Sequence, residues 1–485
     1  MSSPVRTRIA PSPTGLPHVG TIRNALYSWL LARHHGGQFV FRLEDTDRDR
    51  YDAASEQALA DSFRWLGLDY DEGPDVGGPY APYVQSQRLP EYLSVAERLI
   101  REGHAYRCYC SRERIQQTRE ARQKANIHPY GYDRQCRELS EAERRQLEAS
   151  GAPSVVRFAV PLEGETSFQD EVRGTITYQN RELDDHVLLK SDGFPTYHLA
   201  HVVDDHLSEI SHVVRSEEWL PSTPRHVLLY RALGWEAPKL IHPALIHGRD
   251  AQSGKVSKLS KRHGAVFVGE YREQGYLAEA LTNFIALLGW SPGGDLEIMD
   301  REEMVRRFSI EGLNASPSVF DLEKLNWMNG VYIRKLSEEE LVERTLPFLQ
   351  KAGLVSASPS AHEQAYVGQV LKLEQERMKT LAEAPALTDF FFRDEPEYDP
   401  AAVEKRLRTP QARAVLETVI RQLEAAEQWD VESVEAAVRA SIEELGVKPG
   451  EVIHPTRVAA TARTVGPGLF ETLWALGRER VAFRL

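Results

Sequence analysis

The first seventy residues contain a pattern that few folds can satisfy. Residues 5–10 form a short, partly apolar segment that is typical of a strand. The run PSPTGLP at 11–17 can continue neither a strand nor a helix. From Thr21, apolar side chains recur at helical spacing up to the Gly36-Gly37 stop, and a second apolar run covers 39–43. A helical pattern at about 53–66 follows. The order strand, helix, strand, helix predicts a parallel sheet whose ligands bind at the carboxyl ends of its strands.

This α/β pattern is interrupted between about 106 and 185. The interruption holds all three cysteines, a basic helical stretch and strand-like segments near 155–160 and 174–178, and it reads as an insertion. Segments at 187–190 and 213–215 and a helical pattern near 224–233 then resume the first rhythm. After about 270 the periodicity is almost wholly helical. We therefore predict an α/β sheet split by an insertion and followed by an α-helical half.

Composition narrows the class of protein. The chain has 485 residues, of which 41% are hydrophobic and 27% charged, and about three globular domains are expected. No apolar run approaches the ~18 residues that a membrane-spanning helix requires, and residues 1–10 contain no apolar leader core. Three cysteines cannot form a disulfide framework, which fits a reducing compartment. We expect a cytoplasmic protein without a membrane partner.

The net charge of −13 is unevenly distributed along the chain. Residues 101–145 carry 11 Lys or Arg against 7 Asp or Glu, and residues 1–50 carry 7 Arg against 4 acids. Local basic surfaces can bind phosphates or RNA although the protein as a whole is acidic. Basic faces are more often only solvated helices, so charge alone does not establish RNA binding.

Two short segments carry residue types suited to phosphates. His18 and Gly20 stand at the junction of loop and helix, where free N–H groups of the first turn can meet an anion. Lys258 and Lys261, followed by Arg262, lie in a polar stretch and can neutralise the charge that gathers in phosphoryl transfer. Taken separately, each segment also fits an ordinary loop.

Together and in this order, the two segments resemble the HIGH and KMSKS signatures of class I aminoacyl-tRNA synthetases. Here they read HVGT at 18–21 and KLSKR at 258–262, and both departures resemble the glutamyl branch of the family. The resemblance is dense over 5–335 and thinner beyond, where PGLF at 467–470 still matches. Further matching segments are TRIAPSPTG at 7–15, RLEDTD at 42–47, LKSDGFPTY at 189–197 and FDLEKLNWMNG at 320–330.

The resemblance implies a domain organisation. We expect a Rossmann-type α/β catalytic domain with an inserted α/β acceptor-end domain, followed by an all-α anticodon-binding half. The expected boundaries are 1–105 and 187–250 for the catalytic domain, 106–186 for the insertion, 251–335 for the KLSKR loop with the stem-contact helices, and 336–485 for the anticodon-binding domain.

The resemblance also implies an activity, the ATP-dependent ligation of glutamate to tRNA(Glu) with the help of Mg²⁺. The α-carboxylate of glutamate attacks the α-phosphorus of ATP, pyrophosphate leaves, and the 2′-hydroxyl of bound tRNA then takes the acyl group. The carboxylate is ionised at pH 7, so catalysis depends on positioning and charge stabilisation. The expected ATP contacts are His18, Gly20, Lys258, Ser260, Lys261 and Arg262, and of these His18, Gly20, Lys258 and Lys261 are also expected to be catalytic.

Selection of glutamate requires cations for two carboxylates and an anion for the ammonium group. Arg8 and Arg215 are fork-shaped donors suited to carboxylates, and each belongs to a short apolar strand segment. Glu44, after the second strand, can take the ammonium, and Tyr197 can donate its hydroxyl to the side-chain carboxylate. By similarity, Ala10 and Ser12 complete this pocket, whereas His201 stands where relatives often have Asn or Cys.

The three cysteines have a spacing that suits a structural zinc ion, which prefers thiolates in closed tetrahedral sites. A fourth ligand of the usual kind is missing. In zinc-bearing relatives, a tyrosine four residues before the last cysteine can fill that place. Buried, reduced cysteines without a metal are the alternative. The expected ligands are Cys108, Cys110, Cys136 and Tyr132, with His128 or Glu138 as substitutes for the tyrosine.

Arg377 lies in a helical pattern at 371–381 that resembles the stretch where glutamyl enzymes that reject tRNA(Gln) keep an arginine. We expect it to read the third base of the anticodon, because loop bases expose edges that an arginine fork can meet. The alternative is a solvated helix residue among Glu374, Glu376 and Lys379.

Three other functions have to be weighed. A glutaminyl-tRNA synthetase would have β-barrels after 336, where this chain reads as helical. A tRNA-modifying paralogue that glutamylates a queuosine base would lack that half altogether. A non-catalytic tRNA-binding module would not require His18, Lys258, Lys261 and Arg215. A form that charges tRNA(Gln) as well as tRNA(Glu) stays open, and we expect a monomer.

Overall fold

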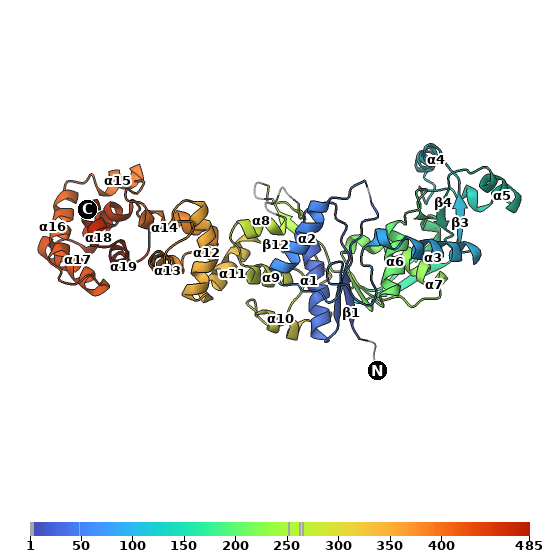
Figure 1. Cartoon of the computed structure of the whole chain (residues 1–485). Helices are drawn as coiled ribbons and strands as arrows, with labels where there is room; N and C mark the ends of the chain where they lie inside the picture. Colours follow the sequence, from blue (N-terminus) through green and yellow to red (C-terminus); the bar gives the residue numbers. More distant parts are fainter. Residues whose placement is uncertain (1–3, 48, 251–252, 261–262, 264–265) are drawn as a thin grey trace. The chain divides into compact units, whose positions relative to one another are not determined.

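The computed structural model describes residues 4–47, 49–250, 253–260, 263 and 266–485, and the chain divides into two compact units (Figure 1). Unit 1 comprises Met1–Glu270 and Leu281–Asp321, and unit 2 comprises Tyr271–Ala280 and Leu322–Leu485. Unit 1 mixes strands and helices, as the sequence predicts. In the described residues no helix combines the length and apolar composition needed to cross a membrane.

A six-stranded sheet forms the centre of unit 1, in the strand order β2-β1-β8-β9-β5-β6. Neighbouring strands are parallel from β2 to β5, and only β5 and β6 pair antiparallel. The predicted parallel sheet is therefore confirmed. Its strands are β1 (Arg6–Ile9), β2 (Gln38–Phe41), β5 (Glu165–Asp170), β6 (Gly174–Gln179), β8 (His212–Val214) and β9 (Lys239–Ile241).

The helices around this sheet begin and end at recognisable signals. The side chain of Asp52 caps α2 by accepting from two backbone N–H groups, and Gly67 ends that helix in the left-handed conformation. The helix predicted at 53–66 is confirmed as α2. These helices are α1 (Val19–His34), α2 (Ala53–Leu66), α3 (Leu89–Arg101), α6 (Tyr197–Leu207), α7 (Thr223–Ala232) and α10 (Arg301–Arg307).

A second, antiparallel sheet of β3 (Ala105–Cys108), β4 (Val155–Phe158) and β7 (Val187–Leu189) lies beside the helices α4 (Arg112–Lys124) and α5 (Glu141–Ala149). Neither helix buries a residue. The chain leaves this sheet after β4, adds the β5–β6 hairpin to the six-stranded sheet, and returns with β7. The two sheets are thus interleaved along the chain, and the five-part division of the sequence stays a prediction.

A third sheet, in the order β11-β10-β12, completes unit 1. Along the chain, β10 and β11 come before the helices α8 (Val268–Glu273) and α9 (Ala278–Ala286), and β12 comes after them. Each of these two helices contributes residues to both units. Its strands are β10 (Ile246–Arg249), β11 (Val256–Lys258) and β12 (Ser318–Phe320).

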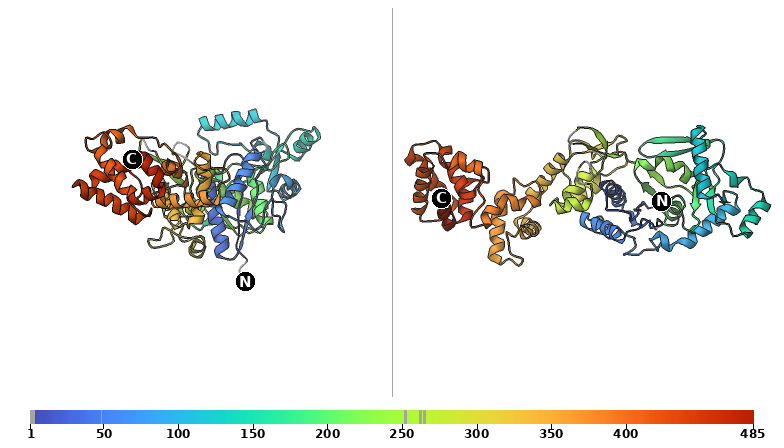
Figure 2. Two further views of the ribbon diagram at one scale, coloured as in Figure 1. Left: turned by 60° about the vertical axis from the view of Figure 1, so that its left-hand side comes forward. Right: turned by 90° about the horizontal axis from the view of Figure 1, so that it is seen from above.

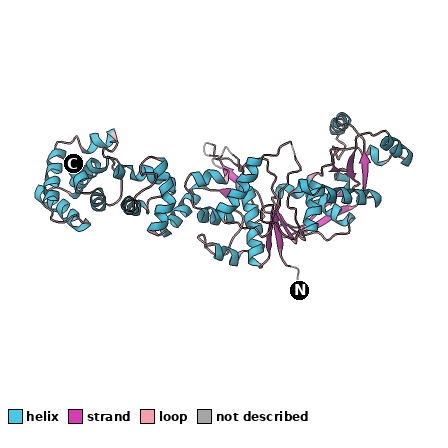
Figure 3. Ribbon diagram, viewed as in Figure 1, coloured by secondary structure: helices cyan, strands magenta, loops and turns pink. Residues whose placement is uncertain are grey.

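Unit 2 is α-helical, which confirms the predicted helical half (Figures 2 and 3). All residues from 322 to 485 are described, and none of them lies in a strand. Its helices are α11 (Leu322–Lys335), α12 (Glu338–Lys351), α13 (Ala361–Glu374), α14 (Ala384–Phe392), α15 (Pro400–Arg406), α16 (Ala412–Glu424), α17 (Val431–Leu445), α18 (Pro449–Thr461), α19 (Leu469–Leu476) and α20 (Arg478–Arg484).

One helix of unit 2 ends earlier than predicted. The helical pattern at 371–381 is wrong beyond Glu374, where α13 stops. The backbone N–H groups of Arg377 and Met378 both donate to the carbonyl of Glu374, at 2.9 and 3.2 Å, which closes a turn. The side chain of Gln375 donates to the carbonyl of Ile333 at 2.9 Å and fixes this turn against α11. Arg377 therefore lies after the helix and not on it.

Candidate functional site

A pocket of about 660 Å³ opens at the carboxyl ends of the parallel strands of unit 1. Its wall is built by the segments that follow β1, β2 and β8 and by the start of α6. We call this hollow the sheet-end pocket. All six residues predicted to contact glutamate line it, namely Arg8, Ala10, Ser12, Glu44, Tyr197 and Arg215. The fold thus gathers residues that are up to about two hundred positions apart, at the edge where a parallel sheet offers its ligand site.

Arg215 is the most extensively bonded side chain of this pocket. It follows β8, is 5% exposed, and donates from Nη1 to the hydroxyl of Tyr197 at 3.2 Å and from Nη2 to the hydroxyl of Thr223 at 3.0 Å. Nε donates to Nε2 of His242 at 3.0 Å, and the ring nitrogens of His201 and His226 lie 3.3 and 3.2 Å from Nη1, so that these two rings and the Tyr197 hydroxyl share the two hydrogens of Nη1. The guanidinium is therefore held in one orientation before any ligand binds.

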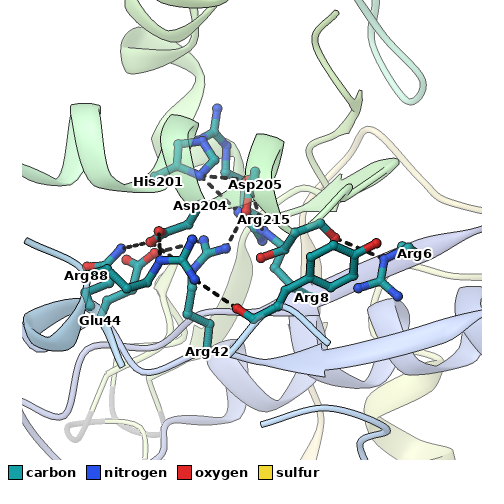
Figure 4. Close-up of polar contacts among 12 residues, drawn as sticks. Arg6, Arg8, Arg42, Glu44, Arg88, His201, Asp204, Asp205 and Arg215 are labelled. Atoms are coloured by element: carbon teal, nitrogen blue, oxygen red, sulfur yellow. Dashed lines mark hydrogen bonds and ion pairs between the residues drawn. The ribbon is translucent and has the colours of Figure 1, made fainter. Parts of the chain in front are cut away.

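Beneath the pocket, arginines and carboxylates form a buried network (Figure 4). A carboxylate oxygen of Asp205 lies 3.2 Å from Nε of Arg8 and 2.8 Å from Nη1 of Arg42. Arg42 also approaches Glu44 at 3.3 Å and Asp204 at 3.5 Å. Removing one partner from such a network would leave an uncompensated buried charge, which is strongly unfavourable. The network consequently fixes the positions of Arg8 and Glu44.

Glu44 and Asp205, two of the carboxylates of this network, differ in their electrostatics. Burial raises the pKa of Glu44 to about 7, although the guanidinium groups of Arg42 and Arg8 favour its charged form. Burial also disfavours the charged form of Asp205, yet Arg8 and Arg42 hold its pKa well below the usual range. Asp205 is a permanent anion of the pocket floor, whereas Glu44 is poised to change its charge near neutral pH.

A second hollow, of about 740 Å³, lies against the start of α1 and β10 and β11. We call it the loop pocket. Four of the residues predicted to contact ATP line it, namely His18, Gly20, Lys258 and Ser260. Lys261 and Arg262 lie outside the described residues. Three residues line both pockets, namely Thr21, Asn24 and Trp219, so the two hollows adjoin.

His18 has a defined orientation in the loop pocket. Its Nδ1 accepts from the backbone N–H of Gly20 at 3.0 Å and so caps α1. Burial and the charge of Lys258 both lower the pKa of His18, which keeps its ring neutral. With Nδ1 as acceptor, Nε2 carries the proton and is the ring's hydrogen-bond donor. Lys258 itself is exposed and pairs with Glu218.

The three cysteines come together in the insertion. The Sγ atoms of Cys108, Cys110 and Cys136 lie within 4.8 Å of one another, and this cluster does not include His128 or Glu138. The hydroxyl of Tyr132 lies 3.8 Å from Sγ of Cys110 and accepts from the backbone N–H of Cys136 at 2.7 Å. Three thiols and one hydroxyl thus face a common centre, which suits a tetrahedral metal ion.

Arg377 lies in unit 2 at the rim of a hollow of about 470 Å³. Its Nη1 is 2.5 Å from a carboxylate oxygen of Glu374, a residue that is fully buried. The side chain of Arg377 is about one third exposed. Trp327 and Lys379 line the same hollow, and Trp327 is 47% exposed. An exposed aromatic ring beside basic side chains is an arrangement that can stack on and pair with a nucleotide base.

Comparison with known proteins agrees with this geometry. Residues 4–327 match the family described as tRNA synthetases class I (E and Q), catalytic domain, and residues 340–485 match the one described as anticodon binding domain. The chain belongs to the class I tRNA synthetases of the E and Q group. The resemblance deduced from the sequence motifs is therefore confirmed, and so is the predicted order of an α/β catalytic part and a helical half.

Individual members of this synthetase family match over the whole chain. A glutamate–tRNA ligase of Dehalococcoides mccartyi is 47% identical over 486 residues, which cover 100% of this chain and 98% of the relative. One of Roseiflexus castenholzii is 46% identical over 490 residues and covers 100% and 96%. The crystal structure of a glutamate tRNA ligase from Elizabethkingia meningosepticum in complex with its amino acid has a TM-score of 0.91 at 33% identity and covers 99% and 98%.

Several residues that surround the sheet-end pocket were not predicted from the sequence. His226, His242, Thr223 and Arg42 all contact residues of the pocket wall, but none was singled out. One signal was present for His242, because it follows β9 directly and the carboxyl ends of parallel strands meet at the same edge. The same signal was present for Arg42, which follows β2 directly, whereas Thr223 and His226 lie on α7 and only the tertiary structure brings them to the pocket.

Proposed function

We propose that this protein uses ATP to join L-glutamate to tRNA(Glu) through a glutamyl-adenylate. The observation that carries the proposal is the adjacency of the two pockets. The sheet-end pocket presents Arg215, Tyr197 and Glu44, which suit an acidic amino acid, and it shares a wall with the loop pocket that contains His18 and Lys258. Relatives that match the whole chain are named glutamate–tRNA ligases.

In the first step, an oxygen of the α-carboxylate bonds to the α-phosphorus of ATP, and the bond to the bridging oxygen of pyrophosphate breaks. No proton has to move, because the carboxylate is already ionised. Arg215 and Tyr197 bind the side-chain carboxylate, Arg8 binds the α-carboxylate, and Glu44 binds the ammonium. Charge-assisted bonds of this kind orient the substrate as well as bind it. Ala10 and Ser12 contact the same substrate from the segment after β1.

The loop pocket stabilises the charge that moves onto pyrophosphate. His18 donates from Nε2 to the α-phosphate, and Lys258 and Lys261 hold the leaving group. Ser260 and Arg262 complete the contacts to ATP, and Gly20 allows the phosphate to approach the first turn of α1. Mg²⁺ neutralises phosphate charge when it is bound, and the half-exposed carboxylate of Glu218 offers the kind of oxygen ligand that this ion prefers.

In the second step, the oxygen of the 2′-hydroxyl of the terminal adenosine of tRNA bonds to the acyl carbon, the bond from that carbon to the phosphate oxygen breaks, and AMP and the hydroxyl proton are released. Arg377 reads the third anticodon base, with the exposed ring of Trp327 beside it as a stacking surface. The enzyme acts as a monomer in the cytoplasm, where tRNA charging supplies translation.

Zinc is the metal that the cysteine cluster fits. The thiols of Cys108, Cys110 and Cys136 and the hydroxyl of Tyr132 would be its four ligands. Zinc would supply structural stability to the insertion, because a closed site of this kind leaves no open coordination position for catalysis.

ATP–pyrophosphate exchange tests the proposed activity. Exchange is measured with glutamate, with glutamine as the matched substrate that differs by one amide, and with or without tRNA(Glu). We expect exchange with glutamate only, and only when tRNA is present. Exchange that prefers glutamine, or none with either amino acid in the presence of tRNA, would contradict the proposal. Charging of tRNA(Gln) beside tRNA(Glu) measures how strictly the enzyme selects its tRNA.

A further inference from the structure

The environment of Arg215 differs from that of the other arginines at the sheet-end pocket. All its hydrogen-bond partners among the described residues are neutral groups, namely the hydroxyls of Tyr197 and Thr223 and the rings of His201, His226 and His242. Arg8 and Arg42, by contrast, are paired with the carboxylate of Asp205. In the described part of the chain, no carboxylate lies within ion-pair distance of Arg215. Burying a guanidinium without an anionic partner is costly, because a buried charge is unfavourable unless it is paired.

The three imidazole rings are fixed as acceptors by groups behind them. Nδ1 of His242 lies 2.6 Å from a carboxylate oxygen of Asp170, so Nδ1 carries the proton and Nε2 accepts from Nε of Arg215. Asp205 lies 2.9 Å from Nδ1 of His201 and fixes that ring in the same way. The carboxylates Asp170 and Asp205 thus stand one ring away from the guanidinium. They orient its acceptors without neutralising its charge.

His226 contributes the third ring through its other nitrogen. Its Nδ1 accepts from Nη1 of Arg215, and its Nε2 lies 3.0 Å from Nδ1 of His198, to which it donates. Burial lowers the pKa of His201 to about 3 and lowers the pKa values of His226 and His242 as well. All three rings are therefore neutral at physiological pH, as acceptance from a guanidinium requires.

We propose that His201, His226 and His242 are positioning residues that hold Arg215 through neutral acceptors only, so that the ligand's carboxylate is the anion with which it pairs. A carboxylate side chain in the place of any ring would satisfy Arg215 internally and remove the reason to prefer an acid over its amide. The inference rests on the proposed function and deepens it, because it assigns the discrimination of glutamate from glutamine to these rings.

His226 allows a matched pair of variants. His226→Asn and His226→Asp have the same shape, and Oδ1 of either side chain can take the place of Nδ1 of the histidine. In His226→Asp the new carboxylate pairs with Arg215. We expect its kcat/KM for glutamate to be about 100-fold lower than that of His226→Asn, mostly through KM, while glutamine changes by less than about tenfold. Equal glutamate-to-glutamine ratios in the two variants would overturn the proposal.

A second test acts from outside the pocket and covers the case in which His226→Asp does not fold. In Asp170→Asn, the amide donates to Nδ1 of His242 and moves the ring proton to Nε2, where it faces the N–H of Arg215. We expect the glutamate-to-glutamine ratio to fall about tenfold. The single variant His242→Gln keeps a neutral acceptor at the position of Nε2 and should retain most of the glutamate-to-glutamine ratio. The double variant Asp170→Asn with His242→Gln should match His242→Gln, because Asp170 acts through the ring.

The control is His212→Gln, since this histidine on β8 contacts Ser211 and not Arg215. Its substrate ratio should equal that of the wild type. A purely structural role of Asp170 predicts a lower melting temperature with an unchanged ratio and additive losses in the double variant, and that result would also overturn the proposal. Failure of the proposed function itself is recognised separately, because the wild type would then show no exchange with glutamate in the presence of tRNA.

Discussion

The sheet-end pocket and the loop pocket share a wall but hold their charges in opposite ways. Arg8, Arg215 and Glu44 are each 4–5% exposed and are fixed by several partners. Lys258 is 57% exposed at its side chain, and it pairs with the exposed Glu218. Exposed ion pairs contribute about 0–1 kcal/mol, whereas removing one partner of a buried pair costs about 3–5 kcal/mol. The charged side chains of the sheet-end pocket are therefore fixed by buried partners, whereas Lys258 of the loop pocket is held by an exposed ion pair.

The largest expected effect concerns the buried side. Arg215→Gln replaces a prepositioned cation with a neutral amide, and we expect kcat/KM for glutamate to fall by about 10³-fold or more while glutamine changes little. Exchange kinetics with both amino acids measure the change. Arg215→Lys, which keeps the charge but not the fork, should lose less. An unchanged glutamate-to-glutamine ratio in Arg215→Gln would show that Arg215 does not contact the substrate side chain.

On the nucleotide side, His18→Ala should lower the rate of adenylate formation by about 10²-fold and leave ATP affinity nearly unchanged. The reason is that the donor at Nε2 matters most where charge develops in the transition state. Single-turnover adenylate formation and equilibrium ATP binding separate the two effects. His35→Ala, at the other end of α1, is the matched control. Equal losses in binding and rate would make His18 a ground-state contact.

The pH dependence of glutamate binding sharpens the contrast. Because burial raises the pKa of Glu44 to about 7, this side chain is protonated in the empty pocket at lower pH. An ammonium ligand requires the charged form, so the affinity for glutamate should fall by about tenfold for each pH unit below 7. Calorimetric titrations between pH 6 and 8 measure this. An affinity that is constant over that range would place the ammonium away from Glu44.

The cysteine cluster also brings its three thiols together in the structure, and Cys108→Ser should affect stability more than catalysis. We expect the variant to lose one zinc ion per chain and to melt several degrees lower, since a structural metal contributes to folding free energy. Elemental analysis and thermal unfolding are the measurements. Ser111→Ala changes a nearby helix cap without removing a thiol and serves as control. A wild-type protein purified without chelators that contains no metal would exclude the zinc site.

The smallest effect is expected at the partly exposed Arg377. In Arg377→Gln the preference for tRNA(Glu) over tRNA(Gln) should fall by several-fold, about 1 kcal/mol, with unchanged glutamate and ATP parameters. Charging assays with both tRNAs measure the ratio. Arg408→Gln removes an exposed, helix-paired arginine of the same unit and should have no effect. Equal preference in wild type and Arg377→Gln would leave Arg377 as the partner of Glu374 alone.

The sequence predicted regular structure best where the signals are local. Asp52 and Gly67 bound α2 at the expected residues, and Gly36-Gly37 ends α1. Local signals did not predict the position of Arg377. That position depends on the hydrogen bond from the side chain of Gln375 to the carbonyl of Ile333, which is distant in sequence and holds the turn after α13.

In the candidate site, too, the residues within recognisable segments were predicted, and those that depend on long-range contacts were not. Most of the predicted wall residues of the sheet-end pocket stand in segments that resemble the synthetase family, such as Glu44 in RLEDTD at 42–47. The rings of His226 and His242 and the carboxylate of Asp170 were not foreseen, because their partner Arg215 is distant in sequence and no periodic pattern links them. A single sequence shows which residues suit a ligand, but rarely those that hold such residues in place.

The strand order of the six-stranded sheet also determines when each strand can pair during synthesis of the chain. Thr7 of β1 pairs with His212 of β8, so the partner of one edge of β1 is synthesised roughly 200 residues later. At ~5–20 residues per second this delay is about 10–40 s. During that interval β1 can already pair with β2 and pack against α1. The backbone N–H and C=O groups on that edge of β1 lack their native partners until β8 has been made. Arg215 emerges directly after β8, so the sheet-end pocket is incomplete until β1 and β8 have paired.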